Sequence, residues 1–371
     1  MSEMLESLRV YCGKPVLITG HTGFKGGWLA AWLTKLGAQV IGYSLAPPTK
    51  PSLFEAAGLE RQITHITGDV RVLEHLLEVF DRYRPQFVFH LAAQAIVKRS
   101  YQEPRLTYET NVMGTVNVLE AVRITGSGTV IVIATSDKCY ENREWVYGYR
   151  ETDPLGGHDP YSSSKGCAEL VAEAYRRSFF TAGGIEGNAC LATARAGNVI
   201  GGGDWAESRL VPDCVKALAA GEEIAIRNPA AVRPWQYILE PLGGYLLLGA
   251  RLRHEGASCG GAWNFGPPDD RMISVEAMVQ KLITCWGRGS YRIEAPPGAP
   301  HEARLLKLDC SKSTALLGWK PVYPLDAALS RTLEWYRRFY GDYSVSRLYD
   351  CTVKEIEEYE SARRGMDGCN E

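Results

Sequence analysis

The sequence lacks several features that mark whole classes of protein. No stretch approaches the roughly 18 consecutive apolar residues that a membrane-spanning helix needs. The N-terminal segment MSEMLESLRVYCGK has two glutamates and no apolar run, unlike a secretion signal. An excess of one charge is also missing, because 41 lysines and arginines face 43 aspartates and glutamates, for a net charge of −2. We therefore expect a cytoplasmic protein with neither nucleic acid nor a membrane as partner, in which local charges bind any anionic ligand.

The cysteines also lack a pattern. All ten occur singly, with no CxxC pair and none at the spacing of zinc ligands. We expect reduced thiols and no metal site. The chain has no internal repeat and no low-complexity tract, and its 45% hydrophobic and 23% charged residues are typical of a globular protein.

The first part of the chain alternates short β-branched runs with longer helical patterns. Strands are expected at 15–19, 39–43, 63–67, 87–92, 129–135 and 189–195, and helices at 28–36, 72–83, 104–125 and 160–180. Runs such as TVIVIA are apolar at successive positions, as in a strand that is covered on both faces. The pattern predicts an α/β fold, a Rossmann-type doubly wound parallel sheet with a smaller C-terminal α/β substrate lobe.

The length of 371 residues also predicts more than one structural unit. The expected units are a dinucleotide-binding Rossmann domain of residues 1–197 with a returning segment at about 237–265, a substrate-binding lobe of residues 198–236 and 266–345, and an acidic C-terminal tail of residues 346–371. Helices are expected in the lobe near 208–220, 274–286 and 325–340. Residues 342–371 carry eight acidic and four basic side chains, which predicts a solvated helix with a frayed end.

Glycines at 20, 23 and 26, spaced three residues apart, follow the first strand in the segment TGHTGFKGGW and lead into an apolar helix. Glycines at this spacing let the backbone turn sharply and approach a pyrophosphate, whose charge meets free N–H groups at the positive end of the helix dipole. Strand, loop, helix and next strand follow within about thirty residues, which favours a dinucleotide site over a glycine turn without a ligand. The loop residues expected at the cofactor are Gly20, Thr22, Gly23, Phe24, Lys25 and Gly26.

The remainder of the cofactor site is less specific. The second strand ends in Gly42-Tyr43-Ser44, without the acidic residue that binds the ribose in NAD proteins and without an adjacent arginine, so NAD and NADP are not separated here. Asp69 and Val70 follow the third strand, where a carboxylate is placed to accept the adenine amino group. The alternative is that Asp69 caps the helix beginning at Val72. Ala92 follows the fourth strand, where a small side chain admits a nicotinamide.

Tyr161 and Lys165 lie four residues apart in DPYSSSKGCAEL, at the start of a helix marked by Asp159 and Pro160. This spacing puts the phenol and the ammonium on one face, so we expect the lysine to lower the pKa of the tyrosine and to hold a nicotinamide ribose. A tyrosine with a lowered pKa can take a proton from an alcohol while hydride leaves the same carbon. YxxxK alone is common by chance, but after the fifth strand of a Rossmann pattern it is specific.

Ser136, Asp137 and Lys138 end the fifth strand, at the carboxyl edge where ligands bind in this architecture. A hydroxyl, a carboxyl and an amine side by side indicate a hydrogen-bond donor, a general acid and a general base. A loop with a surface Asp–Lys pair is the alternative interpretation. The position beside Tyr161 favours the catalytic one.

The chain resembles the extended short-chain dehydrogenase/reductase superfamily over nearly its whole length, and within it the sugar-nucleotide 4,6-dehydratases. The motifs that carry the resemblance are TGHTGFKGGW (19–28), FHLAAQ (89–94), TNVMGT (110–115), TSDKCYENREW (135–145), DPYSSSKGCAEL (159–170), RAGNVIGGGDW (195–205), IRNPAAVRPWQ (226–236), WNFGP (263–267) and HEARLLKLDCSK (301–312). Other members of this family characteristically have Asp-Glu where this chain has Asp137-Lys138. The Asp-Lys version is similar to the branch that acts on CDP-glucose.

The resemblance implies a dehydration without net redox change, with NAD retained through turnover. Tyr161, aided by Ser136, would deprotonate the hydroxyl on sugar carbon 4 as hydride passes to NAD. Lys138 would then remove the hydrogen on carbon 5 while Asp137 protonates the hydroxyl that leaves carbon 6, and the hydride would return to carbon 6.

The resemblance further implies a substrate site and an assembly. The residues expected to contact CDP-glucose are Gln94, Asn111, Asn198, Arg209 and Arg233, with a surface salt bridge as the alternative for each arginine. A homodimer or larger homo-oligomer is expected through the helices at 104–125 and 160–180.

Some questions stay open on the sequence alone. The preference for cytidine rests on the resemblance, and His301-Glu302 resembles a family signature to which we assign no role. Two rival functions remain: another sugar-nucleotide dehydratase or 4-epimerase of the same fold, and a non-catalytic dinucleotide-binding sensor.

Overall fold

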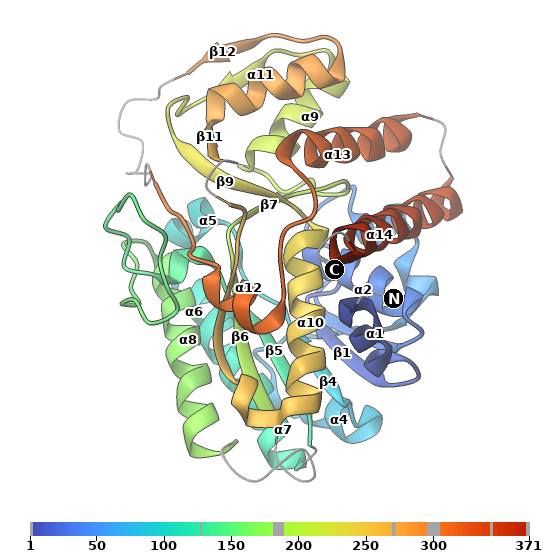
Figure 1. Cartoon of the computed structure of the whole chain (residues 1–371), viewed down its shortest axis with the longest axis vertical. Helices are drawn as coiled ribbons and strands as arrows, with labels where there is room; N and C mark the ends of the chain where they lie inside the picture. The colour runs from blue at the N-terminus through green and yellow to red at the C-terminus, as the bar shows by residue number, and fades with distance from the viewer. Residues whose placement is uncertain are drawn as a thin grey trace.

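The computed structural model describes residues 3–126, 128–180, 189–268, 272–294, 305–341 and 344–368. Its centre is a seven-stranded sheet in the order β10-β6-β5-β4-β1-β2-β3, with every neighbouring pair parallel (Figure 1). The strands are β1 (Pro15–Thr19), β2 (Gln39–Ser44), β3 (Thr64–Thr67), β4 (Phe87–His90), β5 (Val130–Ala134), β6 (Cys190–Ala196) and β10 (Gly261–Phe265). The expected α/β fold with a Rossmann-type doubly wound sheet is confirmed.

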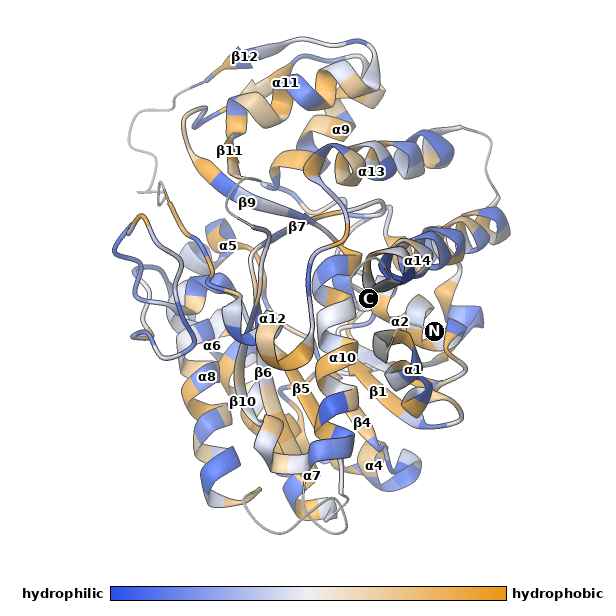
Figure 2. Cartoon of the chain, viewed as in Figure 1, coloured by the Kyte–Doolittle hydropathy of each residue, from blue (hydrophilic) through white to orange (hydrophobic). Residues whose placement is uncertain are grey.

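Two hydrophobic cores cover the two faces of this sheet. Along β5, Val130 and Val132 belong to one core and Ile131 and Ile133 to the other, because successive side chains of a strand point to opposite faces. The first core includes α2 (Phe24–Lys35) and α10 (Leu239–Glu255), and the second includes α4 (Leu73–Tyr83), α7 (Gly114–Thr125) and α8 (Pro160–Ser178). The strands are therefore apolar on both sides, whereas the outer helices mix apolar and polar residues (Figure 2).

The helix expected at 104–125 is interrupted. It consists of α6 (Pro104–Tyr108), a π-helical turn at Glu109–Met113, and α7. The π turn inserts an extra residue into the helix at Asn111, and such bulges frequently occur at functional sites.

The segment expected to return to the sheet at about 237–265 does so only at its end, in β10. Most of it is the helix α10, which the sequence pattern did not predict. The helix is buried on nearly all sides, so it lacks the amphipathic period that marks a surface helix. Its glycines allow close packing: a Cβ at Gly244 would lie 2.4 Å from the Phe265 ring, and one at Gly249 would lie 2.4 Å from the Tyr11 hydroxyl.

A second group of elements lies beyond the carboxyl edge of the main sheet (Figure 1). The strands β7 (Asn198–Ile200), β9 (Val232–Tyr237) and β11 (Met272–Ser274) form a three-stranded sheet, and β8 (Ile224–Ile226) pairs with β12 (Tyr291–Ile293). The accompanying helices are α9 (Leu210–Ala220), α11 (Val275–Trp286) and α13 (Leu325–Tyr340), close to the expected bounds. The division into a Rossmann domain and a substrate lobe stays a prediction.

The acidic C-terminal tail is helical as expected, but it is not solvated all round. The helix α14 (Val345–Gly368) buries Leu348, Ile356 and Tyr359 and packs against α2 and α13. Its acidic side chains are used in this packing, since Glu360 accepts a hydrogen bond of 2.8 Å from Trp32 Nε1 and Glu355 pairs with Arg331. Apolar residues at helical spacing, rather than the acidic composition, decided how this segment packs.

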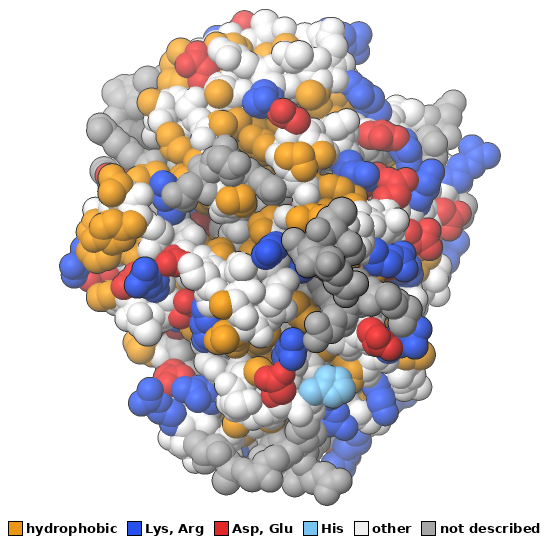
Figure 3. Space-filling model, in the orientation of Figure 1, with side chains coloured by type: hydrophobic (Ala, Val, Ile, Leu, Met, Phe, Trp, Pro, Cys, Tyr) orange, Lys and Arg blue, Asp and Glu red, His pale blue; other side chains and the backbone are white. Residues whose placement is uncertain are grey.

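The distribution of charged side chains on the surface agrees with the near-zero net charge. Acidic and basic side chains are interspersed over the face shown in Figure 3, without a field of one sign. In the part of the chain that the structure describes, no helix has the length and the apolar character of a membrane span.

Candidate functional site

The expected catalytic residues gather at the carboxyl edge of the central sheet. Ser136 and Asp137 follow β5, Tyr161 lies in the first turn of α8, and the glycine loop follows β1. The link between β6 and β7 closes over them, because a Cβ at Gly197 would lie 3.1 Å from Asp137 Oδ2. Segments that are far apart in the sequence therefore enclose one site.

The glycine loop leaves the first turn of α2 open. Gly20 has a φ of 80°, and a Cβ there would lie 2.7 Å from the backbone nitrogen of Ala92. A Cβ at Gly26 would lie 2.2 Å from the Gly20 carbonyl oxygen, so the loop folds tightly onto its own helix. No side chain caps the N-terminus of α2 at Gly23, which leaves backbone N–H groups and the positive helix end for an anion.

Thr22 fastens this loop to the end of β2. Its hydroxyl lies 2.8 Å from Ser44 Oγ and donates a hydrogen bond of 3.0 Å to the Leu45 carbonyl. Ser44 therefore occupies the position where an acidic residue often meets a ribose.

Asp69 does not cap α4. Its carboxylate accepts hydrogen bonds from the backbone and the guanidinium of Arg71, which holds the pKa of Asp69 below its usual value. The N-cap of α4 has no side-chain hydrogen bond. Val70 is buried against Gly114, and Ala92 donates its N–H to Thr19 Oγ1 at 3.2 Å.

Hydrogen bonds within the turn after β5 fix the positions of its side chains. Ser136 donates a hydrogen bond of 2.9 Å to Asp137 Oδ1 and accepts one of 3.2 Å from the backbone of Lys138. Burial raises the pKa of Asp137, while the charge of Lys138 and the Ser136 hydroxyl oppose this rise. Lys138 Nζ lies 5.9 Å from the centre of the Tyr161 ring. A buried carboxyl of raised pKa is suited to act as a general acid.

The expected lowering of the Tyr161 pKa by Lys165 is wrong for this structure. Burial raises the pKa of Tyr161 to about 12, and a hydrogen bond with Ser136 opposes the rise. Burial likewise lowers the pKa of Lys165 to about 8, against the charge of Glu169. The ammonium of Lys165 lies 3.4 Å from the carbonyl of Ala134, so it is held beside the strand end.

Several cations surround the catalytic residues. Lys25 is half-buried, and burial together with the charges of Arg209 and Lys165 lowers its pKa to about 8, while Asp137 opposes this. Lys25 of the glycine loop thus lies toward the catalytic end of the site. The charge of Arg233, from β9, also acts on Asp137. This positive region fits a diphosphate in a chain of almost no net charge.

The residues expected to bind the substrate differ in the contacts that they make within the protein. Arg209 forms an ion pair of 2.8 Å with Asp204, and Arg233 donates to the Val232 carbonyl at 2.9 Å. Asn198 begins β7, in register with Trp235 of β9, and is half-buried.

Gln94 and Asn111 bind each other and the surrounding protein. Asn111 Oδ1 accepts from the Gln94 N–H at 2.8 Å, and Asn111 Nδ2 donates to Ser164 Oγ at 2.8 Å. The Gln94 amide is taken up by Thr107 and the Ile96 N–H. These bonds tie the loop after β4 to the helix of Tyr161, so the geometry favours a positioning role over the expected substrate contact.

Sequence reasoning missed two groups. Glu169 lies in α8 at the same spacing of four that separates Tyr161 from Lys165, and this repeat was the signal that could have found it. The buried Tyr245 hydroxyl, from α10, lacks a hydrogen-bond partner among the described residues. Burial is the largest cause that raises the Tyr245 pKa, and Tyr161 and Asp137 add to it, which places this phenol near the site. His301 and Glu302 lie outside the described residues.

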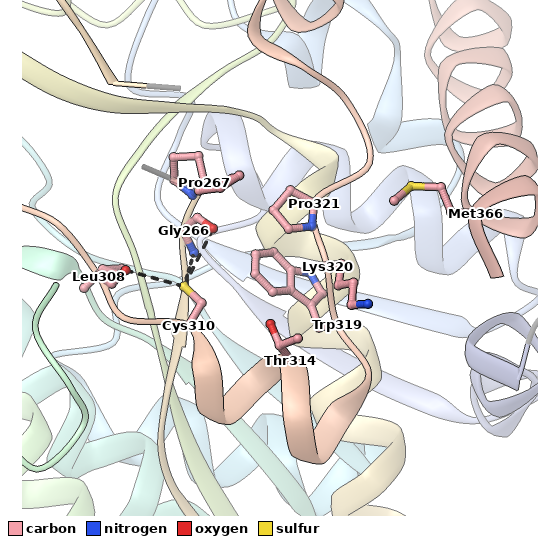
Figure 4. A pocket seen from close by; sticks show the side chains of 10 residues that line it. Gly266, Pro267, Leu308, Cys310, Thr314, Trp319, Lys320, Pro321 and Met366 are labelled. Carbon is pink, nitrogen blue, oxygen red and sulfur yellow. Dashed lines mark hydrogen bonds between the residues drawn. The ribbon is translucent and has the colours of Figure 1, made fainter. Parts of the chain in front are cut away.

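A separate cavity of about 350 Å³ lies beside α12 (Ser311–Leu317) and the end of β10 (Figure 4). Its lining is mostly apolar, with Pro267, Trp319 and Pro321 around it and Cys310 Sγ held by the Gly266 N–H at 3.0 Å. None of the expected site residues lines it.

The chain is similar to known enzymes over most of its length. It is 49% identical over 351 residues to a CDP-glucose 4,6-dehydratase of Salmonella typhimurium, covering 94% of this chain and 97% of that one. A solved dTDP-glucose 4,6-dehydratase from Streptomyces venezuelae with NAD bound is 25% identical, with 87% and 97% of the chains covered and a TM-score of 0.74. A Thermotoga maritima UDP-glucose 4-epimerase with UDP-glucose is also 25% identical, with 87% and 99% covered and a TM-score of 0.73.

The profile of the family described as GDP-mannose 4,6 dehydratase matches residues 17–255, which include the glycine loop, the turn after β5 and the helix of Tyr161. The match therefore covers well over half of the chain and the whole of the catalytic cluster. The chain belongs to this dehydratase family, within the extended short-chain dehydrogenase/reductase superfamily.

Proposed function

We propose that this chain is a CDP-glucose 4,6-dehydratase, a hydro-lyase that forms CDP-4-dehydro-6-deoxy-D-glucose and water. The observation that carries the proposal is a buried Asp137 of raised pKa, placed in one turn with Ser136 and Lys138 and close to Tyr161. The 49% identity to the Salmonella typhimurium enzyme supports CDP-glucose as the substrate.

NAD is the proposed cofactor, and the residues fit it. The open first turn of α2 and the tight approach of Gly20 and Gly26 would receive its pyrophosphate. Lys165 and Tyr161 would hold the nicotinamide ribose, and Val70 and Asp69 would contact the adenine. When bound here, NAD would supply a hydride acceptor that is regenerated within each turnover, so the overall reaction would be redox-neutral.

The side chains of this site supply the proton transfers. Tyr161 would act in its phenolate form, with Ser136 as hydrogen-bond partner, and take the proton of the hydroxyl on carbon 4; the resulting ketone acidifies the hydrogen on carbon 5. Lys138 would remove that hydrogen, and Asp137, whose pKa burial raises, would protonate the hydroxyl that leaves carbon 6 as water. Lys138 would then return a proton to carbon 5 as carbon 6 regains the hydride lost from carbon 4. The proton that Tyr161 gains balances the one that Asp137 gives up, so one water is the only net loss.

The substrate diphosphate is assigned to the positive region around Asp137. Arg233 and Arg209 approach from the smaller sheet and the helix α9, and Asn198 lies at the start of β7. Guanidinium groups suit this task because they can donate two hydrogen bonds to one phosphate group. Gln94 and Asn111 would support the site by holding the loop after β4 in place.

We also propose that residues 198–236 and 266–345 form the substrate lobe and that the protein works in the cytoplasm as a homodimer or larger homo-oligomer. The exposed apolar side chains Tyr108, Met113 and Leu170, on contacting helices, support an interface there. Light scattering of the purified protein tests the assembly: a monomer at micromolar concentration would contradict it.

The test of the function is incubation of the purified full chain, without added NAD, with CDP-glucose and separately with dTDP-, UDP- and GDP-sugars. Mass spectrometry is expected to show loss of one water from CDP-glucose alone. Conversion without loss of mass would indicate an epimerase. No conversion of any sugar nucleotide after NAD is supplied would exclude the dehydratase and leave the dinucleotide-binding sensor.

A further inference from the structure

A buried carboxylate lies beneath the catalytic residues. Glu169 is on α8, and its side chain is about as buried as that of its partner Arg195, with 3% and 4% exposed. The carboxylate accepts three hydrogen bonds: from Thr135 Oγ1 at 2.5 Å, from Thr193 Oγ1 at 2.7 Å and from the guanidinium of Arg195 at 2.8 Å. A buried carboxylate that accepts three hydrogen bonds from groups of the surrounding strands is held in position.

These bonds connect two parts of the proposed active site. Thr135 directly precedes Ser136, while Glu169 lies on the same helix as Tyr161 and Lys165. We propose that Glu169 is a positioning residue, which clamps the Ser136–Lys138 turn to the helix of Tyr161 and so fixes the acid and base groups relative to the tyrosine. This inference rests on the proposed dehydratase function.

Arg195 connects Glu169 to residues farther from the proposed active site. Its guanidinium donates to the Tyr140 hydroxyl at 2.8 Å and lies 4.8 Å from the centre of the Tyr140 ring. The Tyr140 hydroxyl in turn donates to Asn264 of β10 at 2.8 Å. The network thus joins the end of β5 to β6, β10 and α8, so the turn is held by the three strands at the β10 side of the sheet.

The clamp also acts on the charge of Lys165. Glu169 and Cys139 raise the pKa of Lys165 against the larger lowering caused by burial. Lys165 also acts on His90 of β4 and on Lys25 of α2. Its positive charge lowers the pKa of both side chains. Glu169 is therefore the carboxylate whose charge opposes the lowering of the Lys165 pKa by burial.

The main test is Glu169→Gln in the full-length protein, with kcat, KM for CDP-glucose and the pH–rate profile measured. We expect kcat to fall about 100-fold, as for a misplacement of about 1 Å, with KM changed less than about twofold. The alkaline limb of the profile is expected to move to lower pH by about one unit, because loss of a nearby opposite charge lowers the pKa of Lys165.

Glu240→Gln is the matched control. Glu240 is equally buried and accepts from Val322, Tyr323 and Tyr359, but it is not among the charges that act on Lys165. Glu240→Gln is expected to lower the Tm without moving the pH limb.

A second pair of variants covers the case in which Glu169→Gln does not fold. Thr135→Val and Thr193→Val each remove one hydroxyl from Glu169 and keep the ion pair with Arg195. Thr135 adjoins the catalytic turn and Thr193 does not, so Thr135→Val is expected to lower kcat about tenfold and Thr193→Val less than about threefold.

The outcomes separate the two proposals. If the wild-type chain dehydrates CDP-glucose but Thr135→Val and Thr193→Val lose kcat equally, and Glu169→Gln leaves the pH limb in place, the positioning role is refuted and the function stands. If the wild-type chain dehydrates no sugar nucleotide, the proposed function itself fails.

Discussion

Gly26 offers the sharpest test of where the cofactor binds. A methyl group at this position would lie 2.2 Å from the Gly20 carbonyl oxygen and 2.7 Å from His21 Cα. Both neighbours are backbone atoms, so no rotation of a side chain relieves the contact and the loop must open by roughly an ångström, since ordinary contacts begin at 3.4 Å. Gly26→Ala therefore disturbs the open first turn of α2, where we place the pyrophosphate.

The expected loss follows from the hydrogen bonds at stake. If two N–H groups of this turn lose their bonds to the pyrophosphate, at about 1.5 kcal/mol or more for each bond to a charged group, NAD binding weakens by about 3 kcal/mol. This corresponds to an increase of roughly 100-fold in Kd. The assay is the NAD content of the purified protein, together with a calorimetric titration of the NAD-free protein with NAD.

Gly27→Ala is the matched control. Its added methyl would meet Leu53 Cδ2 at 3.0 Å, which is the end of a flexible side chain, and alanine favours the helix by about 1 kcal/mol. This variant is expected to retain NAD. Wild-type NAD affinity in Gly26→Ala, in a protein that remains folded by circular dichroism, would refute the placement of the cofactor on this loop.

Three further predictions concern the reaction. Tyr161→Phe is expected to lower kcat about 1,000-fold with KM nearly unchanged, since it removes the group that takes the proton; steady-state kinetics with less than tenfold loss would contradict this. Asp137→Asn is expected to stop dehydration and to keep the fold. Because burial raises the pKa of Asp137, ionisation of this carboxyl destabilises the folded wild-type protein as the pH rises. Asparagine does not ionise, so the Tm of the variant relative to that of the wild type should increase with pH. A relative Tm that falls with pH in a thermal scan would show that the carboxylate is stabilised instead. Arg233→Met is expected to raise the KM for CDP-glucose by roughly tenfold or more at similar kcat, and an unchanged KM would remove Arg233 from the diphosphate site.

The sequence predicted the candidate site best where chemistry and local pattern coincide. The glycine loop, Tyr161 and the turn after β5 each combine a rare residue order with a strand end, and the parallel sheet brings all strand ends to one edge. Gln94 and Asn111 were predicted at the substrate from sequence. In the structure the Asn111 side chain binds the Gln94 backbone and Ser164, and the Gln94 side chain binds Thr107. The hydrogen-bond partners of a buried side-chain amide depend on how distant segments pack together, and a local sequence pattern does not predict this packing.

The same limit applies to pKa values. The spacing of Tyr161 and Lys165 predicted that both side chains share one face of a helix, but it did not predict that burial raises the pKa of Tyr161 to about 12 and lowers that of Lys165 to about 8. These pKa shifts depend on how much protein surrounds each side chain. Part of that surrounding protein comes from distant segments such as Gly197, which packs against Asp137.

The sequence by itself determined the parallel sheet, because strands that are apolar on both faces and separated by amphipathic helices have few other ways to bury their side chains. It also predicted the candidate catalytic groups through their motifs. Only the tertiary structure decided that the segment after β9 is the buried helix α10, that the acidic C-terminal helix packs against α2, and that Glu169 joins the two halves of the site. Each of these depends on contacts between residues far apart in the chain, and their energies appear only when the chain is folded.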